Sequence, residues 1–329
     1  MNLLTIKNLK KAYTDKVLFD GIDFSLEDGE KVGIIGINGT GKSTLLRIIA
    51  GIEEGDTGEY TKGNHVVINY LPQNPEFAPG QTILEYVIGQ NQMHGIAGDT
   101  SLSGDYGVEG EAKSILNRLG FTDLNQPIDH LSVGQKKKVA LAAVLLSKNE
   151  ILIMDEPTNH LDHNMTEWLE GWLKSYRGSL IMITHDRYFL DLVCNRIVEL
   201  DKGKLYSYKT NYEGFLALKA EREEMALSTQ AKHQNILRKE IAWMQRGARA
   251  RSTKQKAHIK RYEALRDEEK VAVDTEVEIG SLSTRLGNIT IAMDDIAIAY
   301  EGKPLIRDLT YHLLKKDRIA ILEPNGCGK

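Results

Sequence analysis

The sequence has few cysteines and no long apolar run, and both absences exclude classes of protein. Two cysteines, Cys194 and Cys327, occur in 329 residues. Two distant cysteines form neither a disulfide framework nor a zinc site, so we expect a reducing compartment. The longest apolar run, Val139 to Leu146, is too short to span a membrane, and the first residues lack the apolar stretch of a signal peptide. We therefore expect a cytoplasmic protein without a membrane domain.

Excess charge of one sign is also absent, since the net charge is -4. The overall charge thus argues neither for nor against nucleic acid, and its distribution along the chain matters more. The first 210 or so residues alternate short apolar segments with amphipathic ones, which predicts an α/β domain. We expect buried strands at residues 31–35, 151–154 and 180–184, a helix at 42–50, and a terminal hairpin at 196–208.

The composition changes after Phe215. Up to residue 270 there is no proline, Gly247 is the only glycine, and apolar residues recur at helical spacing. This pattern predicts two long helices joined near Gly247, followed by a connector at residues 271–287.

The end of the chain repeats its beginning. Residues 289–329 align without gaps to the N-terminus at a shift of 287, so that Tyr13 falls on Tyr300 and Lys42 on Lys329. A natural short protein and a fragment of a longer one both fit this repeat. We favour the fragment, because a fold that ends after its first strands cannot bury a core. The expected domains are residues 1–212, a helical linker at 213–287, and an incomplete second copy at 288–329.

Residues 36–43 fit the phosphate-binding pattern G-x-x-x-x-G-K-[ST], between an expected strand and an expected helix. Glycines let backbone N–H groups turn toward phosphates at the positive end of the helix. Lys42 should reach the β- and γ-phosphates and Ser43 should bind Mg²⁺. A chance glycine-rich turn is the alternative, and the strand–helix context disfavours it. The predicted ATP-binding residues of this loop are Gly36, Asn38, Gly39, Thr40, Gly41, Lys42, Ser43 and Thr44.

Residues 151–156 form an apolar strand that ends in two carboxylates. Asp155 is the candidate that links to the metal, and Glu156 is placed to orient or deprotonate the attacking water. Two solvated acids at a strand end are the alternative reading. The accompanying phosphate loop favours the interpretation in which the two carboxylates act on the metal and the attacking water.

Residues 131–135, Leu-Ser-Val-Gly-Gln, open a helix with Ser132 as its N-cap. This segment resembles the L-S-G-G-Q signature of the ATP-binding cassette superfamily, with Val133 in place of the first glycine. The phosphate loop described above is a second motif of the same superfamily. The resemblance covers essentially the whole chain and implies a P-loop NTPase cassette fold with ATP and Mg²⁺. It further implies that Gln73 belongs to the Q-loop, Asp162 to the D-loop, His185 is the switch histidine and Tyr13 stacks on adenine.

Roles follow from this resemblance. Glu156, His185 and Gln73 are the expected catalytic residues, while Ser43, Gln73 and Asp155 are the expected Mg²⁺ ligands, partly through water. The signature residues Ser132, Gly134 and Gln135 are expected to act on the nucleotide of a second cassette. ATP hydrolysis to ADP and phosphate is the implied reaction.

Residues 156–162, Glu-Pro-Thr-Asn-His-Leu-Asp, resemble the ABC-F group in particular. That group carries two cassettes in one chain, no membrane domain and a helical linker. Residues 243–257 look similar to its Uup-like bacterial branch. The resemblance implies a translation factor on the ribosome whose linker points toward the transfer RNA in the peptidyl site.

The linker carries a basic run without acids from Arg246 to Arg261. Such a run favours RNA backbone, although a merely solvated helix face is the usual reading. The candidate RNA contacts are Arg246, Arg249, Arg251, Lys254 and Lys256. A DNA-binding cassette protein is one alternative. The ATPase subunit of a membrane transporter is a second, less favoured because such subunits lack the basic interdomain hairpin that this sequence predicts.

Two features depart from the ABC-F pattern. Residues 91–110 are short and rich in Gly and Ser where many members insert a helical arm. In the second phosphate loop Glu323 replaces Gly36, and a carboxylate there repels triphosphate. Since the repeat stops before a second signature, we expect one ATP site and slow hydrolysis, unless two copies pair through their cassette faces as a homodimer.

Overall fold

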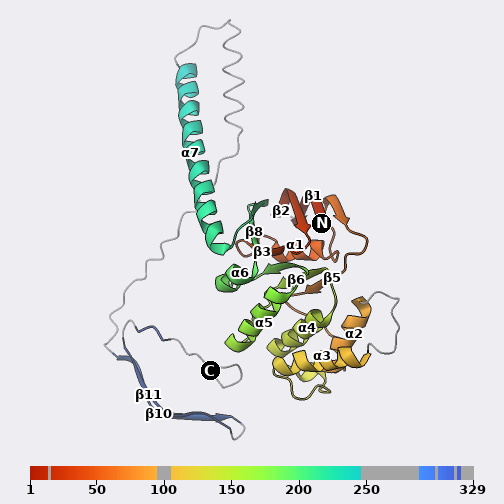
Figure 1. Cartoon of the computed structure of the whole chain (residues 1–329). Coiled ribbons are helices and arrows are strands. Elements are labelled where there is room, and N and C mark those ends of the chain that lie inside the picture. The colour runs from red at the N-terminus through yellow and green to blue at the C-terminus, as the bar shows by residue number, and fades with distance from the viewer. Residues whose placement is uncertain (14–15, 95–104, 246–288, 301–302, 315–316, 320–329) are drawn as a thin grey trace. The chain divides into compact units, whose positions relative to one another are not determined.

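The computed structural model describes residues 1–13, 16–94, 105–245, 289–300, 303–314 and 317–319 (Figure 1). Contacts divide the chain into compact units, and Met1–Glu213 form the main part of one of them. The expected domain limits at residues 212 and 287 stay predictions. In the part of the chain that is described, no helix is both long and apolar enough to cross a membrane.

A six-stranded sheet forms the centre of the first unit. Its strands are apolar segments of four to six residues, and β6 (Ile151–Asp155) and β7 (Ser179–Ile183) are buried along their whole length, as central parallel strands require. All neighbours pair in parallel except the last two, which form the expected hairpin. The order across the sheet is β5 (Ile68–Leu71), β6 (Ile151–Asp155), β7 (Ser179–Ile183), β3 (Lys31–Ile35), β8 (Arg196–Asp201) and β9 (Lys204–Tyr208).

The hairpin turns where the sequence predicts. Lys202 and Gly203 have φ angles of 47° and 76°. Two successive positive φ values are typical of the tight turn that joins antiparallel strands.

A second, antiparallel sheet contributes to the same core. Its strands are β2 (Lys16–Glu27), β1 (Asn2–Tyr13) and β4 (Thr57–Lys62), in that order. Helix α1 (Lys42–Ile49) buries Leu45, Leu46 and Ile49 in one apolar cluster with residues of both sheets. The cluster therefore fixes α1 to the strands on either side, and with it the loop that precedes the helix.

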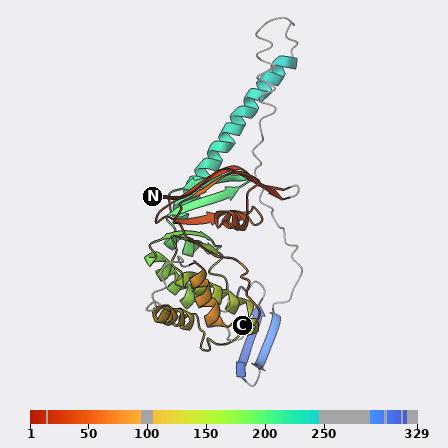
Figure 2. The same ribbon diagram turned by 90° about the vertical axis from the view of Figure 1, so that its right-hand side faces the viewer.

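The remaining helices of this unit include the one that begins at the signature residues. Helices α2, α3 and α4 pack against one another, and Figure 2 shows them grouped away from the antiparallel sheet. The segment at 91–110, where the sequence predicts a missing or reduced arm, includes residues 95–104, which lie outside the described residues, so that expectation stays a prediction. The bounds are α2 (Ile83–His94), α3 (Asp105–Arg118), a 3₁₀ turn (Ile128–His130), α4 (Val133–Leu146), α5 (His163–Ser175) and α6 (Arg187–Val193).

Helix α7 (Tyr212–Gln245) is the first of the two expected long helices. The expected second helix and the connector lie outside the described residues. The chain is described again from β10 (Ile289–Tyr300), which pairs with β11 (Lys303–Leu314).

The β10–β11 hairpin reproduces β1–β2 at a shift of 287. The strand bounds agree residue for residue, since Asn2–Tyr13 corresponds to Ile289–Tyr300 and Lys16–Glu27 to Lys303–Leu314. Positive φ recurs as well, at Asn8 (49°) and Asp295 (48°). In both copies the N–H of that residue donates to the side chain fifteen residues later, Asp23 or Thr310. The repeat seen in the sequence is therefore present in the backbone too.

Candidate functional site

The carboxyl ends of β3, β7 and β6 meet at one edge of the central sheet, because these strands are adjacent and parallel. Loops after parallel strands are where ligands bind in open α/β sheets. A cavity of about 530 Å³ opens here, within the usual range for small-molecule sites. Its lining consists of Tyr13, Lys16, Leu18, Asn38, Gly39, Gly41, Lys42, Ser43, Thr44, Gln73, Asp155, Glu156, Asn159, Ile183 and His185.

The loop between β3 and α1 has a backbone that requires glycine. Gly41 has φ 99° at the N-cap of α1, and a Cβ on Gly36 would lie 2.5 Å from the carbonyl oxygen of Leu200. No side chain caps α1 and no acid occupies its first turn. The N-terminal N–H groups of α1 are therefore available to an anion, which fits a phosphate cradle.

Lys42 bends back over this loop. Its ammonium group donates to the carbonyl oxygens of Gly36 at 2.7 Å and Ile37 at 3.0 Å. Burial lowers the pKa of Lys42, while the charges of Glu156 and Asp155 act in the opposite direction. A phosphate in the cavity would offer this cation a charged partner in place of two carbonyls.

Asp155 ends β6 with a side chain suited to a cation. The residue is 1% exposed, it accepts a hydrogen bond from Ser43, and its Oδ2 has no partner among the described residues. Burial raises the pKa of Asp155, against which Ser43 and Lys137 act. A buried carboxylate oxygen without a partner is costly, and a hard divalent cation with oxygen ligands satisfies it. Asp155 and Ser43 together therefore fit Mg²⁺.

Glu156 follows in an unusual backbone conformation, with φ 53°. Its N–H donates to Ile183 at 2.8 Å, and its carboxylate accepts from the His185 N–H at 3.3 Å. The other carboxylate oxygen lies 3.4 Å from His185 Nε2. Burial raises the pKa of Glu156, and His185 opposes that shift. A carboxylate with a raised pKa, paired with an exposed imidazole at a cavity, is suited to proton transfer.

Tyr13 borders the same cavity at the end of β1. The residue is 46% exposed, its hydroxyl donates to Glu53 on the loop after α1, and it also has a hydrogen bond with the Thr44 side chain. An exposed aromatic face beside a phosphate cradle can stack on a base.

The signature residues do not line the cavity. Ser132 and Gln135 form a capping box at the start of α4, with Ser132 Oγ accepting from Gln135 N–H at 3.3 Å and Gln135 Oε1 accepting from Ser132 N–H at 2.9 Å. Gly134 faces His160, whose Cβ would lie 3.2 Å from an added Cβ. Asp162 caps α5 by accepting from Met165 N–H at 3.0 Å. The role of these residues toward a second cassette stays a prediction.

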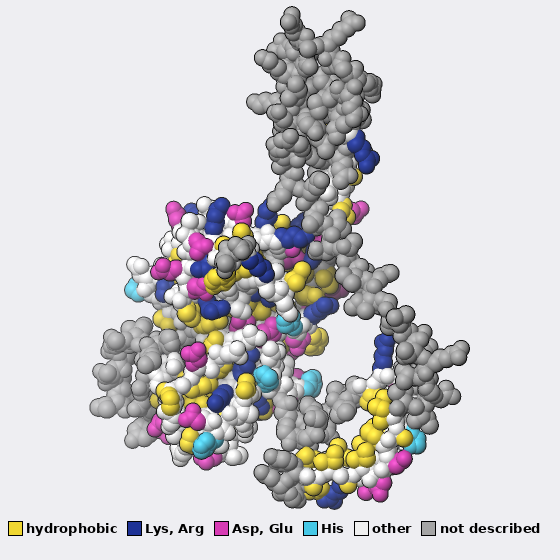
Figure 3. Space-filling view, turned by 180° about the vertical axis from the view of Figure 1, so that it is seen from behind, with side chains coloured by type: hydrophobic (Ala, Val, Ile, Leu, Met, Phe, Trp, Pro, Cys, Tyr) yellow, Lys and Arg dark blue, Asp and Glu magenta, His cyan; other side chains and the backbone are white. Residues whose placement is uncertain are grey.

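Two further predicted residues belong to the phosphate loop without lining the cavity. Gly36 turns the chain out of β3, and Thr40 donates its hydroxyl to the Ile37 carbonyl at 2.9 Å. The predicted RNA contacts from Arg246 to Lys256 lie outside the described residues. Figure 3 shows acidic and basic side chains interspersed on one face of the molecule.

The structure adds residues that the motifs do not contain. Lys16, Leu18 and Ile183 line the cavity, and the amine of Lys16 donates to the Gly39 carbonyl at 2.7 Å. Asn159 also lines it, from the run at 156–162, where the sequence assigned it no role. Lys137, one turn into α4, is 5% exposed and acts electrostatically on Asp155 and Glu156. The excess of lysine at 136–138 is visible in the sequence, but which of the three turns inward is decided by packing.

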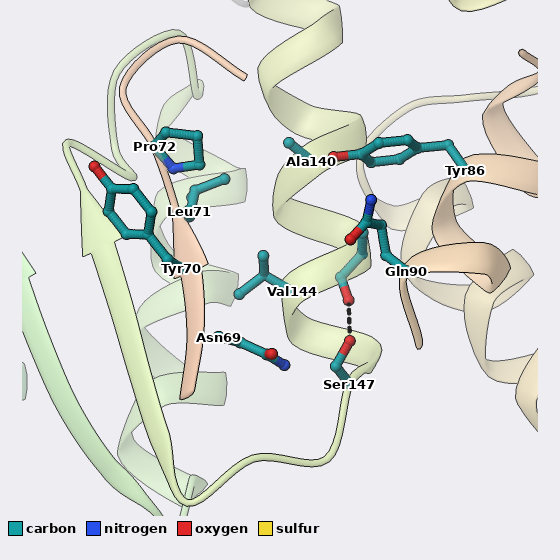
Figure 4. A pocket seen from close by; sticks show the side chains of 10 residues that line it. Asn69, Tyr70, Leu71, Pro72, Tyr86, Gln90, Ala140, Val144 and Ser147 are labelled. Carbon is teal, nitrogen blue, oxygen red and sulfur yellow. Dashed lines mark hydrogen bonds between the residues drawn. The ribbon is translucent and has the colours of Figure 1, made fainter. Parts of the chain in front are cut away.

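A second, smaller cavity of about 50 Å³ lies between β5, α2 and α4 (Figure 4). Asn69 is 2% exposed, and neither atom of its amide has a partner in the part of the chain that the structure describes. Tyr86, Gln90 and Ser147 border this cavity, and the Ser147 hydroxyl donates to the Ala143 carbonyl at 2.9 Å. A space of this size with polar walls suits a few ordered waters.

Comparison with known proteins identifies the family and the fold. Residues 19–159 match a family model described as ABC transporter, and residues 198–279 match a second model with that description. The chain therefore belongs to the ATP-binding cassette family, and its first domain has the α/β fold of ABC ATPases. A solved ATP-binding cassette, a dimer in a post-hydrolysis state with ADP and phosphate, has a TM-score of 0.55 and 25% identity, covering 63% of this chain and 98% of that one.

Several relatives are similar over nearly the whole chain. YfmR of Bacillus subtilis (strain 168), described as an uncharacterized ABC transporter ATP-binding protein, is 43% identical over 100% of this chain and 57% of its own length. The energy-dependent translational throttle protein EttA of Escherichia coli (strain K12) is 32% identical over 95% of this chain and 62% of its own. The ATP-binding protein Uup of Haemophilus influenzae is 31% identical over 100% of this chain and 55% of its own length. The chain thus spans little more than half the length of these relatives.

Proposed function

We propose that this chain binds ATP with Mg²⁺ in the larger cavity, hydrolyses it to ADP and phosphate, and acts on the ribosome in the cytoplasm as an ABC-F protein. One observation carries the proposal. Lys42, Ser43, Asp155, Glu156 and His185, which come from three separate segments, converge on one cavity beside an uncapped helix N-terminus. Hydrolysis of Mg–ATP uses an anion cradle, a cation site and a residue that orients the attacking water, and this cavity offers all three.

Each group has a part in this reaction. The N–H groups of the loop and Lys42 would hold the β- and γ-phosphates. Mg²⁺ would be bound by Ser43, Gln73 and Asp155, partly through water, and when bound it neutralises phosphate charge. Tyr13 would stack on adenine, while Glu156 would orient or deprotonate the attacking water and His185 would contact the γ-phosphate.

Titration calorimetry with Mg–ATP tests the nucleotide site. Lys42→Ala should weaken ATP affinity by about tenfold or more, equivalent to about 1.4 kcal/mol, because the phosphates lose their charged donor. Circular dichroism should be unchanged. Lys62→Ala, an exposed lysine on β4, is the matched control and should bind as the unaltered chain does. Loss of less than about threefold in Lys42→Ala would refute the assignment.

The ribosomal role rests on two features outside that cavity. EttA is described as a translational throttle protein, and it is similar to this chain over 95% of the chain. The sequence run from Arg246 to Arg261 carries basic residues and no acids. A cation-rich segment binds nucleic acid through phosphates, with an affinity that falls as salt rises.

A second candidate function, binding of DNA, is favoured by the same basic run. Co-sedimentation with ribosomes, compared with retention on branched DNA at equal salt, separates the two. Replacing Arg246, Arg249, Arg251, Lys254 and Lys256 with Ala should weaken ribosome binding, flatten its salt dependence and leave ATP affinity unchanged. Preferential retention on DNA would contradict the ribosomal proposal, and an unaltered salt slope would contradict the assignment of these five residues.

A further inference from the structure

Glu53 lies outside every motif of the sequence and does not line the cavity, yet it contacts the residue that would receive the base. The hydroxyl of Tyr13 donates to Glu53 Oε1. Glu53 follows α1, and its own N–H is bonded to the carbonyl oxygen of Arg47 at 3.3 Å. The chain thus brings the end of β1 and the end of α1 together through this contact.

Two cations hold the Glu53 carboxylate in place. Lys11 Nζ lies 3.2 Å from Oε1, and Arg47 Nε lies 3.9 Å from Oε2. The Lys11 and Glu53 side chains are 13% and 20% exposed, so water screens this pair less than it screens a surface pair. Burial acts to raise the pKa of Glu53, but the hydrogen bonds from Tyr13 and Lys11 bring it below its usual value. The group therefore stays ionised as an acceptor.

Lys11 has further bonds that restrict its position. Its amine donates to the Glu54 carbonyl at 2.8 Å and lies 3.6 Å from Asp56 Oδ1. It also lies 5.4 Å from the centroid of the Tyr13 ring. Tyr13 borders the cavity and Lys11 does not. The cation consequently supports the ring from outside the cavity.

The Tyr13 hydroxyl also has a hydrogen bond with the Thr44 side chain, so Glu53 and Thr44 both hold the ring. Tyr13 is 46% exposed at the last residue of β1, where packing restricts a side chain weakly. A stacking platform contributes more to binding when its orientation is fixed before the base arrives, because less side-chain freedom is lost on binding. We propose that Glu53 is a positioning residue that sets how strongly a purine base binds, by holding the Tyr13 ring at the edge of the cavity. This inference rests on the proposed ATP site and deepens it.

The test separates binding of the base from binding of the phosphates. Calorimetry on the full chain compares Mg–ATP with Mg–tripolyphosphate, which lacks the nucleoside. Glu53→Ala should weaken ATP binding about fivefold, a loss of about 1 kcal/mol, and leave tripolyphosphate affinity unchanged. Glu53→Gln retains an acceptor for the Tyr13 hydroxyl, so its ATP affinity should lie between those of Glu53→Ala and the unaltered chain. Glu54→Ala, the neighbouring exposed glutamate, is the matched control and should change neither affinity.

A double-mutant cycle shows whether Glu53 acts through Tyr13. In a Tyr13→Ala background, Glu53→Ala should have no further effect on ATP affinity. Three outcomes would each overturn the inference: a further loss of ATP affinity in the Tyr13→Ala background, an equal loss of tripolyphosphate affinity in Glu53→Ala, or no loss of ATP affinity in Glu53→Ala. Failure of the unaltered chain to bind Mg–ATP at all would refute the proposed function instead, whereas an intact tripolyphosphate affinity shows that the phosphate loop remains folded.

Discussion

At the scale of single residues, Glu156 is held in a conformation that its side chain alone does not favour. A non-glycine residue at φ 53° is uncommon, and such strain persists where surrounding contacts impose it. The contacts here are the hydrogen bonds to Ile183 and His185. They aim the carboxylate at the cavity, where an attacking water would lie.

Glu156→Gln should lower the rate of phosphate release by about 100-fold or more, because general-base catalysis contributes ~10²–10⁴. ATP affinity should be retained, since the amide keeps the shape of the side chain. Single-turnover phosphate release at saturating ATP measures the first quantity and calorimetry the second. Glu59→Gln on β4 is the control for a charge change elsewhere. Unchanged turnover in Glu156→Gln would remove this residue from the reaction.

Residue roles differ in how far the sequence predicts them. The phosphate loop and the Asp155–Glu156 pair are contiguous, so a pattern can find them. Lys137 and Glu53 belong to no such pattern, since each acts on a residue from a distant segment of the chain. No spacing along the chain indicates that contact.

At the scale of elements, α4 begins with a motif that has a structural role as well as the expected functional one. The capping box between Ser132 and Gln135 satisfies two N–H groups at the start of the helix. Lys137 and several alanines and leucines of α4 are buried further along. The cap therefore stabilises a helix that reaches the carboxylates of β6.

Ser132→Ala should lower the free energy of unfolding by about 1 kcal/mol, the usual cost of losing an N-cap side chain. Urea titration followed by circular dichroism measures this. Ser132→Asp keeps an acceptor at the cap and should restore stability. Equal stability of the Ser132→Ala variant and the unaltered chain would show that the capping box is not needed.

The sequence predicts elements well where a pattern is local. The strands at 31–35 and 151–154, the helix at 42–50 and the hairpin after residue 196 all occur, with ends that differ by a residue or so. Their apolar runs and turn residues are adjacent along the chain. The order β6-β7-β3 is not local, because it depends on which buried strands pair.

At the scale of the whole molecule, the described cavity has a phosphate loop on one side, and the signature residues of the same domain do not line it. A relative in the family was solved as a dimer with ADP and phosphate. For this chain, pairing of two copies through their cassette faces stays a prediction from the sequence, in which each copy would supply its Ser132 to the cavity of the other. Specific ATPase activity should then rise steeply with protein concentration.

Mixing two inactive variants tests this arrangement. Lys42→Ala removes the phosphate contact, and Ser132→Asp keeps the helix cap but places a negative charge where the signature would meet the γ-phosphate. Each alone should be nearly inactive. A mixture should regain activity, since a mixed pair has one site with both an intact Lys42 and an intact Ser132. Constant specific activity on dilution, with no recovery on mixing, would contradict pairing.

The sequence by itself determined the family resemblance, the phosphate loop, the paired carboxylates and the repeat at a shift of 287, because each is a pattern of adjacent or regularly spaced residues. Tertiary structure alone decided that Asp155 carries a buried oxygen with no partner among the described residues, that Lys137 turns inward, and that Glu53 contacts Tyr13. These features arise where strands and helices far apart in the chain pack together. Burial and through-space charge act on distances in the fold, and sequence spacing does not contain those distances.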